Sequence, residues 1–203
     1  MCVYHLLYTL ICAKSFEVTR GIIMVRDMND HDFFTDLLSA DDVVSEIRSK
    51  LDELVRIVPE IKFMINFEHC HPHHHLDVFE HTLLALSHSK NDLKTRTVLL
   101  FHDIGKPLCY QQDGEIRHYR GHAEKSAAMA KEILERLGFD TVFTNDVVKT
   151  VKKHDTPLSE SDITAFPDFS RELFEVQKCD ALAHNPEHNK KRMDYIDFIE
   201  SKL

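Results

Sequence analysis

Two histidines and two aspartates lie where a folded chain would bury them. His102 and Asp103 follow the apolar or β-branched run of residues 97–101, at the end of a predicted helix. His81 and Asp180 each lie on the apolar face of another predicted helix. Burying an imidazole or a carboxylate costs several kcal/mol unless a partner satisfies it, and a divalent metal ion is one such partner.

We expect these four residues, His81, His102, Asp103 and Asp180, to hold one divalent transition metal ion. Their mixed nitrogen and oxygen ligands suit Mn, Fe, Co, Ni or Mg better than a closed zinc site, and they leave positions for water and substrate. Such an ion can activate water for attack on phosphorus. For the His-Asp pair taken alone, a neutral histidine hydrogen-bonded to a carboxylate explains the motif equally well.

Histidine is the unusual residue of this composition, with fifteen in the chain. The histidines of residues 69–75 crowd one short segment, which we interpret as a polar, partly mobile loop at the mouth of the site. Of these we expect only His74 to contact a substrate. The histidines that we expect at the surface are His5, His31, His88, His118, His184 and His188.

Bulk composition excludes several classes of protein. A net charge of −9 argues against an extended nucleic-acid surface, although a metal site can still attract a small anion. Five cysteines without a CxxC pair argue against a disulfide framework and fit a reducing, cytoplasmic location. The five scattered glycines exclude a P-loop or a Rossmann motif. The apolar stretch of residues 3–13 is too short to cross a bilayer, so we expect no membrane partner.

Apolar periodicity predicts an all-α helical bundle. Asp113 and Gly114, between two short runs, predict the one small β-hairpin. We interpret residues 1–23 as an extension, disordered or upstream of a true start at Met24, residues 24–58 as a helical extension, and residues 59–203 as the catalytic domain. The predicted helices cover about residues 30–38, 43–58, 78–86, 95–104, 122–137, 146–154, 170–180 and 190–203.

The four candidate ligands resemble the H…HD…D signature of the HD superfamily of metal-dependent phosphohydrolases, and residues 102–107 resemble its HDIG branch. The similarity extends over residues 59–186 to the HD domain attached to some bacterial tRNA nucleotidyltransferases. It includes the segments Pro72-x-His74, Gly121-His122-x-x-x-Ser126 and Lys178-Cys179-Asp180-Ala181. No Gly-Ser followed by paired aspartates occurs, so we expect a free-standing HD domain.

The resemblance implies hydrolysis of a phosphomonoester or phosphodiester in a nucleotide or another small phosphorylated metabolite. It implies catalytic roles for Asp103, Lys106, His122 and His154. Relatives with two metals tend to carry His-His or a single His where this chain has His154-Asp155. This difference leaves open whether a second metal ion binds. We expect His122 and His154 to contact the phosphate instead, and the residues expected to bind substrate are His74, Lys106, His122, His154 and Asp155.

Two alternatives use the same scaffold. One is a catalytically silent HD module that binds a nucleotide and regulates another process. The other is a di-iron oxygenase, which would need His122, His154 and Asp155 to bind iron.

Overall fold

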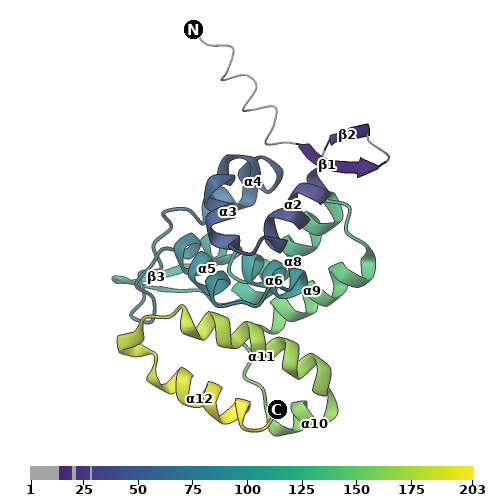
Figure 1. Ribbon diagram of the computed structural model, residues 1–203. Coiled ribbons are helices and arrows are strands. Elements are labelled where there is room, and N and C mark those ends of the chain that lie inside the picture. The colour runs from purple at the N-terminus through teal and green to yellow at the C-terminus, as the bar shows by residue number, and fades with distance from the viewer. Residues whose placement is uncertain (1–13, 20–21, 28) are drawn as a thin grey trace.

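The computed structural model describes residues 14–19, 22–27 and 29–203, so the part of the expectation for residues 1–23 that concerns residues 1–13 and 20–21 lies outside the described part. The described chain is predominantly helical (Figure 1), which confirms the all-α prediction. No helix in the described residues is long and apolar enough to cross a membrane. The helices are α2 (Asp30–Ser39), α3 (Val43–Ser49), α4 (Leu51–Ile57), α5 (Val78–Ser87), α6 (Leu93–Phe101), α7 (Lys106–Cys109), α8 (His122–Arg136), α9 (Thr141–Lys153), α10 (Glu160–Ala165), α11 (Pro167–Leu182) and α12 (Lys190–Glu200), with the 3-10 turns η1 (Pro59–Phe63) and η2 (Pro186–His188).

Side-chain caps decide where several helices begin. Asp77 accepts a hydrogen bond from the backbone N–H of Glu80 at the start of α5, and Asp92 caps α6 in the same way. Asp140 accepts from two backbone N–H groups, so α9 begins at Thr141, earlier than the predicted start near residue 146.

Other helix boundaries also differ from the prediction. The predicted helix over residues 43–58 is interrupted at Lys50, which separates α3 from α4. Helix α11 begins at Pro167, because proline is well suited to the first helical position, where its missing N–H is not needed.

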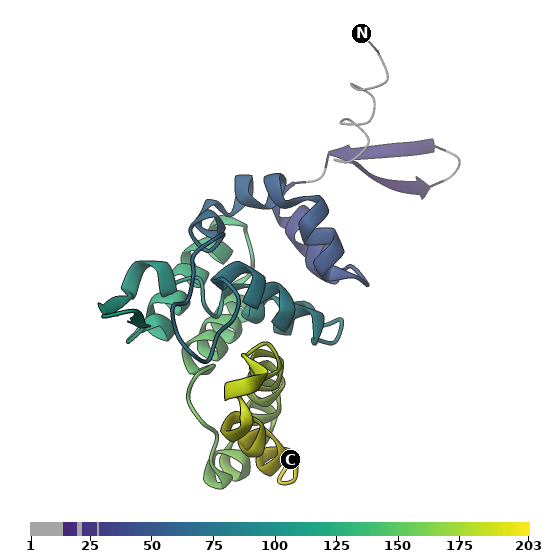
Figure 2. The same ribbon diagram turned by 90° about the vertical axis from the view of Figure 1, so that its left-hand side faces the viewer.

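Helix α6 lies at the centre of the core. Its residues Val98, Leu99, Leu100 and Phe101 are completely buried, and the helix contacts α2, α5, α8, α9 and α11. A smaller apolar cluster, which includes Leu173 of α11, fills the space between α11 and α12. Figures 1 and 2 show these two helices side by side at the C-terminal end of the molecule. The polar residues at the end of α6 therefore enter the interior of the fold.

Two antiparallel strand pairs complete the described structure. The predicted hairpin is confirmed as β3 (Gln111–Asp113) and β4 (Ile116–His118), with Gln111 opposite His118. Strands β1 (Lys14–Thr19) and β2 (Ile22–Asp27) form a pair that the sequence analysis did not predict. Their β-branched and aromatic content favours strands, but their position in the presumed extension concealed this signal.

Candidate metal centre

The end of α6 directs two adjacent side chains toward one centre. The helix ends at Phe101, and residues 102–105 form a turn that leads into α7. The turn packs tightly on α8, because the Gly105 N–H donates to Ser126 Oγ at 2.9 Å and a Cβ on Gly105 would lie 2.7 Å from the Ser126 nitrogen. His102 and Asp103, which precede this glycine, are both almost completely buried.

His81, His102 and Asp180 form a first cluster, in which one ligand atom from each lies within 4.8 Å of the others. His81 Nε2 lies 2.9 Å from Asp180 Oδ1, and His102 Nε2 lies 3.6 Å from the same oxygen. Asp103 Oδ2 lies 3.3 Å from His102 Nε2 and 3.8 Å from His81 Nε2. The fold thus brings together all four metal ligands predicted from the sequence.

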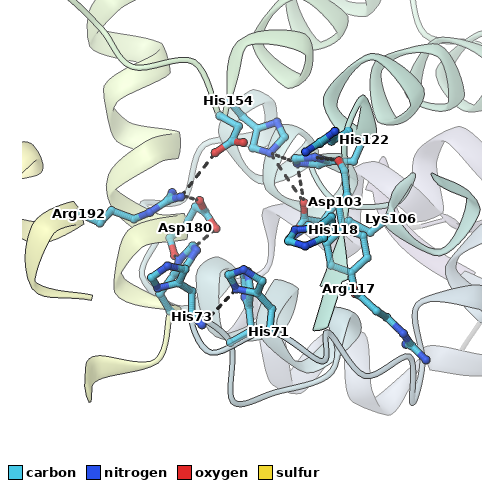
Figure 3. A pocket seen from close by; sticks show the side chains of 15 residues that line it. His71, His73, Asp103, Lys106, Arg117, His118, His122, His154, Asp180 and Arg192 are labelled. Atoms are coloured by element: carbon cyan, nitrogen blue, oxygen red, sulfur yellow. Dashed lines mark hydrogen bonds and ion pairs between the residues drawn. The ribbon is translucent and has the colours of Figure 1, made fainter. Parts of the chain in front are cut away.

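Asp103, His122 and His154 form a second cluster on the other side of the same carboxylate. Asp103 Oδ1 lies 3.5 Å from His122 Nε2 and 3.8 Å from His154 Nε2. The two Nε2 atoms are 3.2 Å apart, and Figure 3 shows both rings directed toward Asp103. Asp103 therefore faces the first cluster with one oxygen and the second cluster with the other.

The four histidines of these clusters share one orientation. Each places Nδ1 close to a backbone carbonyl oxygen, which can only accept a hydrogen bond, so Nδ1 carries the proton. In the neutral form of each ring the lone pair is then on Nε2, and Nε2 points toward the carboxylates. Metal-binding histidines are typically oriented by such an outer hydrogen bond. The pairs are His81 with Ala183 at 3.2 Å, His102 with Leu99 at 2.7 Å, His122 with Tyr119 at 2.8 Å, and His154 with Val151 at 2.7 Å.

Several buried polar atoms at the centre lack a hydrogen-bond partner among the described residues. They include His102 Nε2 and Asp103 Oδ1. Leaving such atoms unsatisfied is costly, because burial removes them from water. A divalent cation would satisfy them together, and the nitrogen and oxygen donors present fit such an ion.

Electrostatic coupling links the central residues. Burial lowers the pKa of His102, but the carboxylates of Asp103 and Asp180 outweigh it and raise that pKa to about 10. Burial raises the pKa of Asp103, yet neighbouring His102 and Lys106 hold it well below its usual range. The pKa of His154 is lowered to about 4 by burial and by His102. The Asp103 carboxylate is therefore anionic and attracts positive charge to the centre.

The centre opens into a cavity of about 320 Å³, which all the predicted substrate-binding residues line. Lys106 is buried, and its Nζ lies 2.7 Å from Asp103 Oδ2. The ring of His74 stacks on that of His69 with centroids 3.7 Å apart. Asp155 is exposed at the cavity edge and lies 3.5 Å from Arg192 Nη2. We refer to this space as the first cavity.

Two histidine predictions were wrong. His184, expected at the surface, is buried beside the first cluster, with Nδ1 2.8 Å from the Asp180 carbonyl oxygen. Its spacing of four residues from Asp180 places both on one helix face and was the available signal. His118 was also expected at the surface but is half-buried and lines the first cavity.

Two further residues of the site were missed by the sequence analysis. His69 was placed in a polar loop, yet it is buried with Nδ1 2.9 Å from the Leu76 carbonyl oxygen and Nε2 3.2 Å from Lys106 Nζ. Arg192 on α12 donates from Nη1 to Asp180 Oδ2 at 2.9 Å, a contact visible in Figure 3. No local sequence signal distinguishes Arg192 from a solvated helix residue.

Comparison with known proteins supports the resemblance. The chain is 36% identical over 110 residues to the CC-adding tRNA nucleotidyltransferase of Thermus thermophilus, covering 51% of this chain and 25% of the relative. It is 34% identical over 99 residues to the A-adding tRNA nucleotidyltransferase of Deinococcus radiodurans, covering 45% and 23%. The chain thus spans about a quarter of the length of these relatives. The family model described as HD domain matches residues 73–195, which is more than half of the chain, and the chain belongs to the HD domain family.

Proposed function

We propose that this chain is a metal-dependent phosphohydrolase that cleaves a phosphomonoester or phosphodiester bond in a nucleotide or another small phosphorylated metabolite. The observation that carries the proposal is the buried carboxylate of Asp103 between two groups of ligands. Every histidine in those groups presents Nε2 inward, and the centre opens into a cavity large enough for a small ligand.

His81, His102, Asp103 and Asp180 would hold the first ion. Held there, a divalent metal such as Mn, Fe, Co, Ni or Mg supplies positive charge for the phosphoryl oxygens and lowers the pKa of a bound water molecule.

Asp103, His122 and His154 would hold a second ion. The two Nε2 atoms face each other at 3.2 Å, and with Nδ1 protonated in both neutral rings neither can donate to the other. Three acceptor atoms in one place favour a cation over the phosphate contact expected from the sequence.

The remaining residues of the first cavity would bind and orient the substrate. Lys106 is buried beside Asp103 and can donate to a phosphoryl oxygen from a position fixed by His69. His74 forms part of the cavity wall. Substrate hydroxyl groups can donate to Asp155, because carboxylate oxygens accept hydrogen bonds.

Two observations favour hydrolysis of a small molecule over the alternatives. A di-iron oxygenase would need Asp155 as a ligand, but Asp155 is exposed and lies 3.5 Å from Arg192, outside both clusters. The names of the relatives refer to nucleotide addition to tRNA, whereas a net charge of −9 does not favour binding of an extended RNA.

A screen of nucleotides, cyclic nucleotides and sugar phosphates tests the proposal, using chelated protein reloaded with Mn, Co, Ni, Fe or Mg. We expect release of phosphate, or opening of a diester, only with metal. Tight nucleotide binding without turnover under every metal would support the regulatory module instead.

A further inference from the structure

A second cavity adjoins the first. It has a volume of about 300 Å³ and is lined by residues of the α9–α10 connection, α11 and α12. Three residues, His154, Asp155 and Arg192, line both cavities. The two spaces therefore meet at the edge of the proposed metal centre, where His154 belongs to the second cluster.

The shared boundary is polar. Arg192 donates to Asp180 Oδ2 at 2.9 Å, and its other terminal nitrogen lies 3.5 Å from Asp155 Oδ1. The side chain of Asp155 is half exposed, whereas that of Asp180 is almost fully buried. A ligand that crosses this boundary would meet both a guanidinium donor and a carboxylate acceptor.

The second cavity has a flat and fixed wall. Tyr195 accepts a hydrogen bond from the Leu158 N–H at 2.7 Å, and its hydroxyl donates to Gln177 Oε1 at 2.9 Å. These two bonds restrain the ring of Tyr195. Pro157 adds apolar surface to the same cavity. Aromatic and proline surfaces of this kind pack well against a planar ring.

We propose that the second cavity binds the nucleoside part of a nucleotide whose phosphate lies in the first cavity. The inference rests on the proposed function, and it assigns the ring to Tyr195 and Pro157 and the sugar hydroxyls to Asp155 and Arg192. Continuity with the metal centre supports this occupant, because His154, which would hold the second ion, lies on the shared boundary, and a phosphate bound to that ion would have its ester group beside the second cavity. Substrates with a small leaving group would use the first cavity alone.

Lys191 offers a direct test, since it is exposed and lies on the wall of the second cavity but not of the first. Lys191→Trp should narrow the second cavity without touching the metal centre. Lys190→Trp is the matched control, because Lys190 lies outside both cavities and makes an exposed ion pair with Asp194 at 3.0 Å.

The assay compares a nucleoside 5′-monophosphate with glycerol phosphate on the manganese-loaded protein. We expect Lys191→Trp to raise the KM for the nucleotide about tenfold or more, which corresponds to at least about 1.4 kcal/mol of lost binding. Turnover of glycerol phosphate, bound metal and melting temperature should stay unchanged. Lys190→Trp should leave both substrates unaffected.

Two results would overturn this assignment: an unchanged KM for the nucleotide, or an equal loss for both substrates in Lys191→Trp. Equilibrium dialysis of the nucleotide separates the two proposals. If the wild-type protein hydrolyses neither substrate, the proposed function is contradicted. Weaker nucleotide binding by Lys191→Trp would then still support the nucleoside site, and equal binding by both proteins would refute it.

Discussion

Replacement of Arg192 by methionine tests whether α12 fixes a ligand of the proposed first ion. Arg192 holds Asp180 Oδ2 at 2.9 Å, while Asp180 Oδ1 faces His81 at 2.9 Å. One carboxylate oxygen is thus restrained so that the other is presented to the metal centre. Methionine keeps an apolar side chain of similar reach but removes the guanidinium group.

The expected magnitude follows from this contact. A hydrogen bond to a charged group contributes about 1.5–3 kcal/mol, and the side chain of Arg192 is 35% exposed, so we take the lower end. A loss of about 1.5 kcal/mol corresponds to roughly tenfold weaker metal binding, similar to the usual effect of removing an outer hydrogen bond from a ligand.

Calorimetric titration of Mn²⁺ into the chelated protein measures this change. We expect a roughly tenfold higher Kd in Arg192→Met and partial recovery in Arg192→Lys, which restores one donor. Arg171→Met is the control, because Arg171 lies on α11 and its side chain is 59% exposed and 3.6 Å from Asp168. Unchanged affinity in Arg192→Met, or an equal loss in the control, would refute the positioning role.

Three other predictions address the centre itself. Asp103→Ala should lose bound metal and reduce turnover by about 10³-fold or more. Its helicity, measured by circular dichroism, should stay largely intact. A variant that retained both metal and activity would contradict the shared role of Asp103. His81→Ala and Asp180→Ala should lower the affinity for the same ion by similar factors, each more than about 100-fold. If a metal titration shows unchanged affinity in either variant, the residue replaced in it is not a ligand. In chelated protein, the pKa of His102 is raised from 6.5 to about 10. The contribution of the protonated His102 ring to the free energy of unfolding is therefore complete below pH 6.5 and is lost as the pH rises through 10. Melting temperatures measured over this range should fall more steeply in the wild-type protein than in His102→Gln, and parallel curves would show that the shift is absent.

The central ligands could be predicted because they are polar residues on helix faces that otherwise carry apolar residues. Charged side chains on apolar helix faces, such as Asp180 on α11, conflict with the periodicity around them and indicate a function. The contact between these residues could not be predicted from local sequence, since His81 and Asp180 are 99 residues apart and contact each other through helix packing. The family resemblance supplied that link, and helical periodicity alone did not.

The residues that were missed are those whose roles depend on long-range packing. Arg192 looks like an ordinary solvated arginine until α12 packs on α11 and brings it to Asp180. His69, in the loop after η1, is buried with its Nε2 3.2 Å from Lys106 Nζ, a contact that no local pattern indicates. The start of α9 was misplaced for a simpler reason, because the capping aspartate at position 140 was overlooked.

The metal content of the purified protein tests the central claim most directly. Elemental analysis should give a metal content that approaches two ions per chain. The phosphatase activity of the same protein should be lost on chelation and restored when the metal is reloaded. In His122→Gln and in His154→Gln, the content should fall to about one, and turnover should drop by about 10²–10⁴. Activity that survives complete removal of metal would contradict the account, and a single ion in the wild-type protein and in both variants would contradict the second site.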